Sequence, residues 1–387
     1  MSIFKRVLNN IEENKLIKDI GGYNSIPWIG LPKFSSTLPG VMRRTYYLIT
    51  ASSKVGKTQL TDSMFILQPY KFINSPLNKE SKIEIDIDYF LLEMSKEEKI
   101  TTFLSHFLYV DHGIRIEPNK LLSLYQEQTV SDELFKLTKS KEYADKFEDF
   151  ESKIKIHDNI ANPYGIYKEV YNYAKQTGYY ADTKNRRINW EDLKEGSKSE
   201  AYKFVDHYVP NNPNMYKIVI VDHTSLLTPE KGGTLHATMD NWSSVRALNL
   251  KKKFGYTMVD VQQQSAEQEK QQFNYKGHSI TEKLKPSPDG LADNKKTQRN
   301  VDVMLGLFAP ARYNIGSYPE EGLSYAINKM GDAYRELSII LNRKGGGLQS
   351  VDLYFDGATN YFKELPEIMK MTPEMYRNIS NRSIKIT

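Results

Sequence analysis

The sequence predicts an α/β protein whose central, mostly parallel sheet is flanked by helices. Short apolar runs recur at residues 46–50, 85–92, 216–221 and 256–261, and such runs are typical of parallel strands that are buried on both faces. Helical stretches separate several of these runs, as the crossover connections of a parallel sheet require. Polar residues follow the runs directly, at the carboxyl ends of the strands, where open α/β sheets bind their ligands.

The stretch from Tyr46 to Thr58, YYLITASSKVGKT, leads from an apolar strand through a loop into a helix. This order predicts a phosphate-binding loop for a nucleotide, in which backbone N–H groups and Lys57 hold phosphate and the Thr58 hydroxyl binds Mg²⁺. The usual pattern has glycine where this chain has Ala51. A chance Gly-Lys-Thr in a surface loop is the alternative, which the strand–loop–helix context disfavours. The residues expected to bind nucleotide are Ala51, Ser52, Ser53, Lys54, Val55, Gly56, Lys57 and Thr58.

Composition limits the classes of function. The chain has 387 residues and no cysteine, so disulfides, thiolate metal sites and cysteine catalysis are excluded. A net charge of +5 is too small for a general nucleic-acid coat, so any DNA contact requires a local basic patch. The apolar runs are too short to span a membrane and the N-terminus is too polar for a secretory signal. A cytoplasmic protein is the simplest interpretation.

Two acidic residues follow apolar runs. Glu93 comes directly before a helix expected over residues 96–110, and it is the candidate general base that activates the attacking water. A helix-capping acid near Ser95 is the alternative interpretation of Glu93. Asp222 ends the run of residues 216–221, and a carboxylate at that strand tip would hold Mg²⁺ through water, beside Thr58.

Three glutamines, Gln262, Gln263 and Gln264, follow the strand expected at residues 256–261. A neutral amide there can hydrogen-bond the γ-phosphate or its water and so sense hydrolysis, although a polar loop residue is the alternative. The next segment, residues 265–300, is polar and basic with interleaved aromatic residues, which suits contact with single-stranded nucleic acid. A solvated loop is the alternative. The candidate DNA-binding residues are Lys276, Lys295, Lys296 and Arg299.

The rest of the chain gives weaker signals. Residues 2–19 predict an amphipathic helix, and its apolar stripe must dock on its own domain or on a neighbouring subunit. We therefore treat residues 1–26 as an N-terminal helix and linker. Further expectations are a charged, solvated helical stretch at 131–153, an insertion at 179–215, strands at 154–157, 301–308 and 336–341, a hairpin around Gly357, and a loose C-terminal tail at 366–387.

Taken in order, the motifs resemble the RecA-like core of the DnaB-type hexameric replicative DNA helicases, over residues 27–365. ASSKVGKT resembles the phosphate loop of that family, FLLEMSKEE its strand with the catalytic glutamate, and IVIVDHTSLL its Walker B strand. VDVQQQSAEQE resembles the strand with the sensor glutamine, which gives that role to Gln263. LNRKGG resembles the turn with the arginine finger, which gives that role to Arg343. The resemblance implies that Arg343 acts on a neighbour's ATP, in a ring or helical homo-oligomer, with a hexamer as the expected assembly.

The sequence also departs from that family. Leu341 stands where the family has a lysine two residues before the finger, and Gln298 and Arg299 replace acidic residues that precede Asp302. Residues 179–215 are additional, and the family's helical N-terminal domain has no counterpart here. A short helicase core of this kind resembles a bacteriophage replication protein, which would work in the cytoplasm of a bacterial host.

The resemblance implies an ATP-dependent, ring-forming DNA helicase that translocates on single-stranded DNA, with a primase or a helicase loader as a candidate protein partner. A RecA-like recombinase, or an accessory DNA-dependent ATPase that does not unwind, is one alternative. A nucleotide-binding scaffold protein that has lost turnover is another. Leu341 favours the scaffold, whereas the presence of Lys57, Thr58, Glu93 and Asp222 argues against it.

Overall fold

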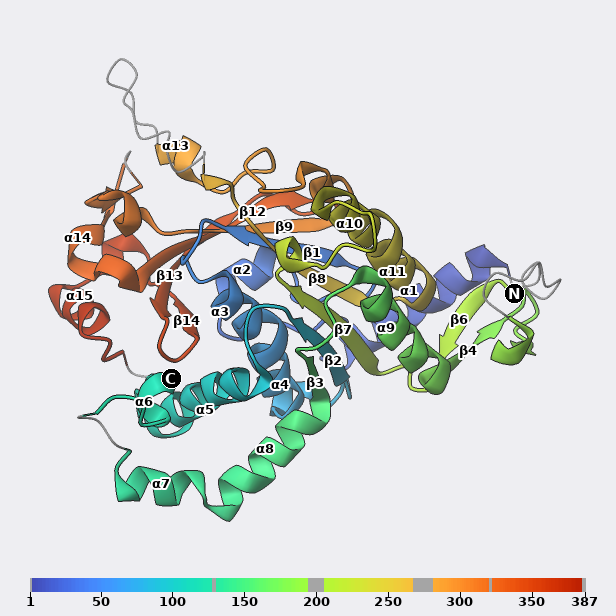
Figure 1. The fold of residues 1–387 in the computed structure, drawn as a ribbon, viewed down its shortest axis with the longest axis horizontal. Coiled ribbons are helices and arrows are strands. Elements are labelled where there is room, and N and C mark those ends of the chain that lie inside the picture. Colours follow the sequence, from blue (N-terminus) through green and yellow to red (C-terminus); the bar gives the residue numbers. More distant parts are fainter. Residues whose placement is uncertain (1, 127–129, 194–204, 267–280, 320–321, 385–387) are drawn as a thin grey trace.

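The computed structural model describes residues 2–126, 130–193, 205–266, 281–319 and 322–384. Among these residues, one large sheet contains nine strands (Figure 1). Its spatial order is β14 (Tyr361–Glu364), β13 (Ser350–Asp356), β12 (Tyr334–Asn342), β9 (Val303–Phe308), β1 (Tyr46–Ala51), β8 (Thr257–Gln263), β7 (Met215–Asp222), β2 (Glu84–Leu91) and β3 (Ile154–His157). The strands from β9 to β3 run parallel, and β12, β13 and β14 are antiparallel additions at one edge. The predicted mostly parallel sheet is therefore confirmed.

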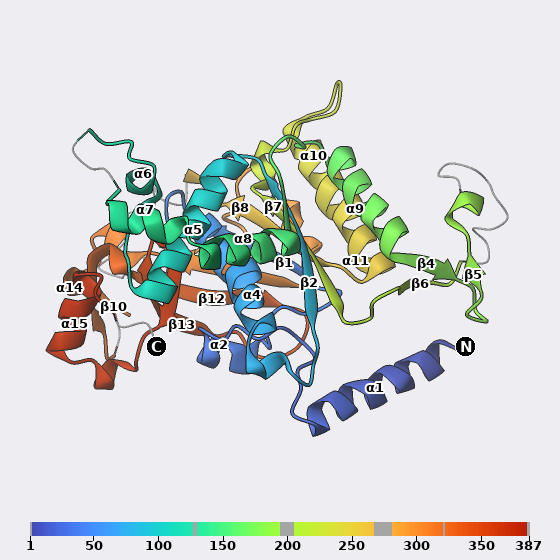
Figure 2. The same cartoon turned by 90° about the horizontal axis from the view of Figure 1, so that it is seen from below.

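Both faces of the sheet are buried, because successive residues of a strand point to opposite faces. Along β1, Tyr47 and Ile49 belong to a core on one face, whereas Tyr46 and Leu48 belong to a core on the other. The first core includes α3 (Lys57–Asp62), α4 (Gln68–Ile73), α5 (Lys96–His112) and α8 (Lys141–Lys153). The second includes α9 (Pro163–Thr177), α10 (Leu235–Asn241) and α11 (Leu248–Phe254), and Figure 2 shows the two groups of helices. Burial on both sides explains why the strands are apolar along their length.

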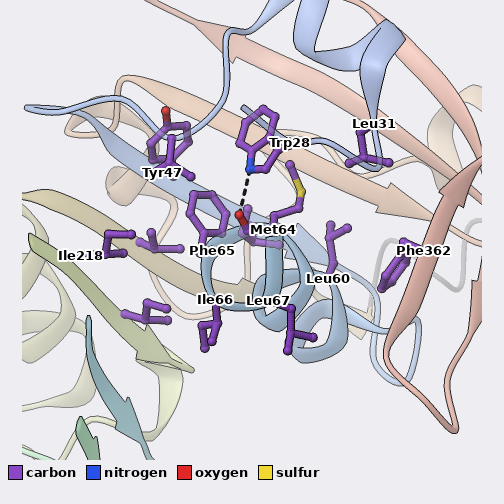
Figure 3. Close-up of a cluster of buried hydrophobic side chains, with 14 of the residues drawn as sticks. Trp28, Leu31, Tyr47, Leu60, Met64, Phe65, Ile66, Leu67, Ile218 and Phe362 are labelled. Atoms are coloured by element: carbon purple, nitrogen blue, oxygen red, sulfur yellow. Dashed lines mark hydrogen bonds between the residues drawn. The ribbon is translucent and has the colours of Figure 1, made fainter. Parts of the chain in front are cut away.

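The helix that follows β1 contains a π-helical segment, η1 (Ser63–Leu67), between α3 and α4. The buried Trp28 donates from Nε1 to the Met64 carbonyl oxygen at 2.8 Å (Figure 3). Its ring also meets Phe65 and Tyr47 edge to face, with centroid distances of 6.1 and 6.4 Å. Through these contacts, Trp28, which precedes β1, packs against the helix that follows β1. The loop between β1 and that helix is therefore bounded by two elements that contact each other. A second π-helical segment, η6 (Trp242–Ala247), joins α10 to α11.

Smaller elements complete the described chain, and none of its helices is long and apolar enough to cross a membrane. The helices are α1 (Ile3–Asp19), α2 (Pro32–Thr37), α6 (Pro118–Leu121), α7 (Asp132–Thr138), α13 (Thr281–Leu284), α14 (Ile327–Met330) and α15 (Pro373–Ser380). The 3₁₀ turns are η2 (Pro76–Asn78), η3 (Trp190–Asp192), η5 (Thr224–Leu226), η7 (Lys295–Arg299), η8 (Pro310–Tyr313), η9 (Gly331–Ala333) and η10 (Ile368–Lys370). The additional strands are β4 (Gly178–Ala181), β5 (Arg187–Ile188), β6 (His207–Pro210), β10 (Ser317–Tyr318) and β11 (Tyr325–Ala326).

The N-terminal helix α1 lies along the outside of the molecule (Figure 2). Its apolar side chains face solvent, with Ile3, Phe4 and Ile11 between 57% and 70% exposed. The helix contacts the segment at 179–215 through Arg6, whose Nη1 lies 2.5 Å from Oδ2 of Asp206. In that segment, β4, β5 and β6 form a separate antiparallel sheet. This ion pair is one of the described contacts between α1 and the rest of the chain, and the apolar side chains of α1 stay exposed.

Two expectations about helical segments are corrected. Residues 366–387 do not form a loose tail throughout, because they include η10 and α15, and Ile379 of α15 is 3% exposed in a third core with α14. Thr372 caps α15 and Pro373 occupies its first turn, a start signal present in the sequence. The stretch at 131–153 is two helices, α7 and α8, and α8 buries Tyr143 and Phe150 in the first core.

Candidate functional site

The loop expected to bind phosphate lies between the end of β1 and the start of α3, so the predicted strand–loop–helix order is present. Gly56 caps α3 at a φ of +109°, a conformation that favours glycine. A Cβ at Gly56 would lie 3.1 Å from the Phe355 ring, a tight contact that the ring would have to relieve by a small shift. Lys57 is 9% exposed, and its ammonium donates to the Ser52 carbonyl oxygen at 3.3 Å. The Lys57 ammonium therefore curls over the loop, where phosphate would bind.

Two arginines hold the outside of this loop. Arg335 is 1% exposed and donates from Nε to the Val55 carbonyl oxygen at 2.8 Å, while its Nη2 lies 2.7 Å from Oδ1 of Asp332. Arg312 donates to the Ser53 carbonyl oxygen. Because a peptide unit is planar, these contacts also fix the orientation of the N–H groups that follow Ser53 and Val55 in the loop. Sequence reasoning missed both arginines, because no local pattern connects them to a loop about 260 to 280 positions earlier.

The tips of three parallel strands bring the other candidate residues to the same edge of the sheet. Asp222 pairs in register with Leu91, two residues before Glu93, and Gln263 pairs with Ala51. Glu93 is exposed at the β2 tip. The capping box of α5 is formed by Ser95 and Glu98, whose Oε2 accepts from the Ser95 N–H at 2.8 Å. Glu98 therefore fills the capping role that was the alternative for Glu93.

The three glutamines after β8 have different surroundings. Gln262 and Gln264 are buried and tied to the backbone, since Gln262 donates to the Asn294 carbonyl oxygen at 2.9 Å and Gln264 to that of Ser287 at 3.1 Å. Gln263 is half-buried beside the first residue of the phosphate loop. Gln262 and Gln264 thus hold the loop at 287–294 on the sheet. Gln263 is the one of the three whose position suits contact with a nucleotide.

The residues expected to hold Mg²⁺ fit that ion. Asp222 is 1% exposed, and its Oδ2 lies 3.1 Å from the Tyr89 hydroxyl. Its other oxygen, Oδ1, is buried without a hydrogen-bond partner among the described residues. Mg²⁺ prefers oxygen ligands and usually keeps water and phosphate in its coordination shell. No cluster of three or more His, Asp or Glu side chains suited to a metal occurs in the described residues, so Thr58, Asp222 and the nucleotide itself would supply the ligands.

Arg343 lies at the opposite edge of the sheet from this site. Strand β12 runs antiparallel to β9, so its first residues lie near the phosphate loop and its last residue, Asn342, pairs with Val303 at the start of β9. Arg343 is exposed there, and its Nη1 donates to the Arg299 carbonyl oxygen at 2.7 Å. Lys344 donates to the Arg44 carbonyl oxygen at 2.9 Å. Arg343 is therefore separated from the phosphate loop of its own chain.

The candidate DNA-binding residues are only partly described. Lys295, Lys296 and Arg299 are exposed on η7, which precedes β9. Asn294 caps this turn, its side chain accepting from the Lys296 N–H at 2.9 Å. Lys276 lies outside the described residues. The cations of η7 are thus presented to solvent on a turn with a fixed backbone.

A groove of about 1190 Å³ lies apart from the loop expected to bind phosphate. It lies between α4, α5, α8 and β14, and its lining includes Leu67, Phe107, Val110 and Phe362. None of the residues expected to bind nucleotide, metal or DNA lines it. Its apolar side chains make it a candidate surface for protein contact, and we return to it below.

No protein-family model matches the chain, and no characterised protein sequence does. Solved structures do match. The ATPase domain of G40P aligns with a TM-score of 0.63 at 17% identity, over 94% of this chain and 99% of that domain. A DnaB-like replicative helicase, solved in a study of its interactions with primase, aligns with a TM-score of 0.60 at 15% identity, over 95% of this chain and 67% of the helicase. The resemblance to DnaB-type helicases is therefore confirmed at the level of the fold: the described chain has the α/β fold of these two helicase structures.

Proposed function

We propose that the chain is an ATP-dependent DNA helicase that forms a ring and translocates on single-stranded DNA. One observation carries the proposal most directly. Five candidate residues lie at the carboxyl edge of the parallel strands, around a loop with the sequence and shape of a phosphate site. They are Lys57, Thr58, Glu93, Asp222 and Gln263. The likeness to two helicase structures supports the proposal through the fold, and the site residues support ATP as the substrate.

Each residue has a distinct task in hydrolysis. The loop N–H groups and Lys57 would hold the phosphates of ATP in line for attack, and Glu93 would accept the proton of the attacking water. Gln263 would hydrogen-bond the γ-phosphate or that water without competing for the proton. Mg²⁺, when bound by Thr58 and Asp222, neutralises charge that builds up on the phosphates. The protein thus acts mainly by positioning and by electrostatic stabilisation.

The placement of Arg343 supports an oligomer in which the active site is shared. An arginine at the amino edge of the sheet can approach an ATP only on a neighbouring chain, and such a finger stabilises charge in the transition state. Head-to-tail contacts of this kind close into rings or continue as helical filaments. We propose a ring, with a hexamer as its expected size.

The exposed stripe of α1 supplies a second contact for such a ring. Ile3, Phe4 and Ile11 together form an apolar surface of the kind that normally marks an interaction site. The groove lined by Leu67, Phe107, Val110 and Phe362 is an apolar surface that could receive it on a second copy. We therefore propose that α1 docks in this groove of a neighbouring subunit.

DNA contact is assigned to the exposed cations of η7. Lys295, Lys296 and Arg299 follow one another on a single turn, so they suit the backbone of a single strand and need no base-specific contact. We further propose, on the likeness of the fold alone, a primase or a helicase loader as a protein partner.

The test is ATP hydrolysis by wild type and by Glu93→Gln, with and without single-stranded DNA, together with unwinding of a forked duplex. Glu97→Gln is the matched control, because Glu97 is also exposed and near the start of α5 but does not lie at the strand tip. The proposal expects DNA-stimulated hydrolysis and fork opening by wild type and by Glu97→Gln, and neither by Glu93→Gln.

Other outcomes separate the alternatives. Hydrolysis that DNA stimulates, without fork opening, would identify a recombinase-like or accessory ATPase. ATP binding without turnover in wild type would refute the helicase and identify a scaffold protein. In that case Leu341, which packs among apolar neighbours and stands where the family has a lysine, would be the first residue to test as the cause.

A further inference from the structure

A buried polar cluster lies beneath the proposed metal site. The ammonium of Lys99 is 2.9 Å from Oδ2 of Asp62, and both side chains are at most 1% exposed. The amide of Asn360 donates to the same oxygen at 2.9 Å. The hydroxyl of Tyr89 lies 3.0 Å from the other oxygen, Oδ1 of Asp62. A buried ion pair is costly unless further hydrogen bonds satisfy it, and here Lys99 and Asn360 both donate to Oδ2 of Asp62.

The members of this cluster come from elements that also carry site residues. Asp62 follows Thr58 by one helical turn on α3, and Lys99 lies on α5, the helix that begins just after Glu93. Tyr89 is on β2, and Asn360 is in the turn between β13 and β14. The cluster therefore joins the elements that position the phosphate loop and the candidate base.

Tyr89 connects the cluster to Asp222. Its hydroxyl lies 3.0 Å from Asp62 and 3.1 Å from Oδ2 of Asp222, but it has only one proton to donate. Lys99 and Asn360 both donate to Oδ2 of Asp62 and offset its charge, whereas the Tyr89 hydroxyl is the donor that the structure places at Oδ2 of Asp222. We therefore assign the Tyr89 proton to Asp222. A hydrogen bond to Oδ2 fixes the orientation of the Asp222 carboxylate. Among the described residues, the oxygen left without a partner is then Oδ1, which remains as an acceptor for Mg²⁺ or for a water molecule bound to it.

We infer that Tyr89 is a positioning residue for the metal, and that the Asp62–Lys99 pair and Asn360 hold Tyr89 in place to orient the Asp222 carboxylate toward Mg²⁺. The inference rests on the proposed function, because it assumes that Asp222 binds the metal of a metal–nucleotide complex. Groups that orient a metal ligand by hydrogen bonds have large effects on metal affinity, and their loss typically costs about 10- to 100-fold.

A cluster that served only stability would behave differently. Its loss would weaken folding as much as the loss of any other buried hydroxyl, with no specific effect on the metal. Tyr47→Phe provides that comparison, since Tyr47 is fully buried like Tyr89. The Tyr47 hydroxyl donates to the Gly40 carbonyl oxygen at 2.8 Å and accepts from the Met42 N–H at 3.0 Å, near the start of β1 and away from the site.

The experiment measures binding of Mn²⁺ to the full chain with saturating ADP, by electron paramagnetic resonance of the free ion. We expect Tyr89→Phe to raise the Mn²⁺ concentration for half-saturation about 10-fold, and Tyr47→Phe to leave it at the wild-type value. ADP affinity without metal should be the same in all three proteins. In hydrolysis assays, added Mg²⁺ should restore much of the turnover of Tyr89→Phe, because the ligands themselves remain.

An unchanged Mn²⁺ affinity in folded Tyr89→Phe would overturn the inference and leave the proposed function intact. Wild type that binds ADP but no Mn²⁺ would overturn the proposed site and the inference together. Asn360→Gly decides the matter if Tyr89→Phe does not fold, because glycine adopts the φ of +50° found at Asn360 and only the donor to Asp62 is lost. A weakened affinity for Mn²⁺ in Asn360→Gly supports the inference, and an unchanged affinity refutes it.

Discussion

Arg343→Ala should abolish ATP turnover without weakening ATP binding, because the residue cannot reach the nucleotide of its own chain. Arg343 follows Arg335, which contacts the phosphate loop, by eight positions along β12. At a strand rise of about 3.3 Å per residue this separation is about 26 Å. A finger in trans typically contributes about 10³- to 10⁵-fold to turnover. The expected variant therefore binds nucleotide normally, assembles, and hydrolyses ATP at least about 10³-fold more slowly.

Mixing two inactive variants tests directly whether Arg343 acts on the nucleotide of a neighbouring chain. Arg343→Ala keeps Glu93 but lacks the finger, whereas Glu93→Gln lacks the base but keeps Arg343. In an equal mixture, a site is complete where an Arg343→Ala subunit supplies the base and a Glu93→Gln subunit supplies the finger. Random head-to-tail assembly gives about one quarter of such sites, so we expect up to about 25% of wild-type hydrolysis. Mixed oligomers, verified by native mass spectrometry, that stay as inactive as either parent would refute the trans assignment.

Three further predictions use other parts of the structure. Deletion of residues 1–20 should reduce the oligomer to smaller species by light scattering, and an unchanged mass would contradict the docking of α1. Lys295, Lys296 and Arg299 can be replaced together by alanine. The slope of log K against log salt concentration for binding of single-stranded DNA should then become less steep by about 2, at about 0.7 per lost phosphate contact. An unchanged slope would show that the DNA binds elsewhere. Burial raises the pKa of Asp260 to about 7. The folded protein therefore binds this proton more tightly than the unfolded chain does. The free energy of unfolding should fall by at most about 4 kcal/mol as the pH rises from 4 to 7. Asp260→Asn should remove that part of the pH dependence in denaturant titrations, and a curve that keeps its slope would show that other groups cause it.

The parallel strands and the phosphate loop could be predicted from the sequence because their signals are local. A strand buried on both faces is apolar along its length, and Gly-Lys-Thr after such a strand leaves few other interpretations. The choice of Gln263 among three adjacent glutamines depended on the resemblance. Its neighbours prove to be bound to the backbone at residues 287–294, a long-range contact that no local pattern indicates.

The supports of the site could not be predicted, because they depend on contacts between distant residues. Arg335 meets Val55 across 280 positions, and Asn360 meets Asp62 across 298. Asp62 and Lys99 look like ordinary polar residues of two helices until folding buries them together. The helix α15 was missed for a related reason. Its polar sequence does not indicate burial, and Ile379 acquires a core only when α14 packs beside it.

The direction of β12 determines what kind of assembly can complete the site. Because this strand is antiparallel to β9, its first part places Arg335 against the phosphate loop and its end places Arg343 at the amino edge. A two-fold dimer that joined amino edge to amino edge would leave both fingers far from both nucleotides. A head-to-tail contact joins the amino edge of one chain to the carboxyl edge of the next, so every contact completes one site. The proposed trans role of Arg343 therefore requires a ring or a helical filament and not a two-fold dimer, and in a closed ring the number of complete sites would equal the number of subunits.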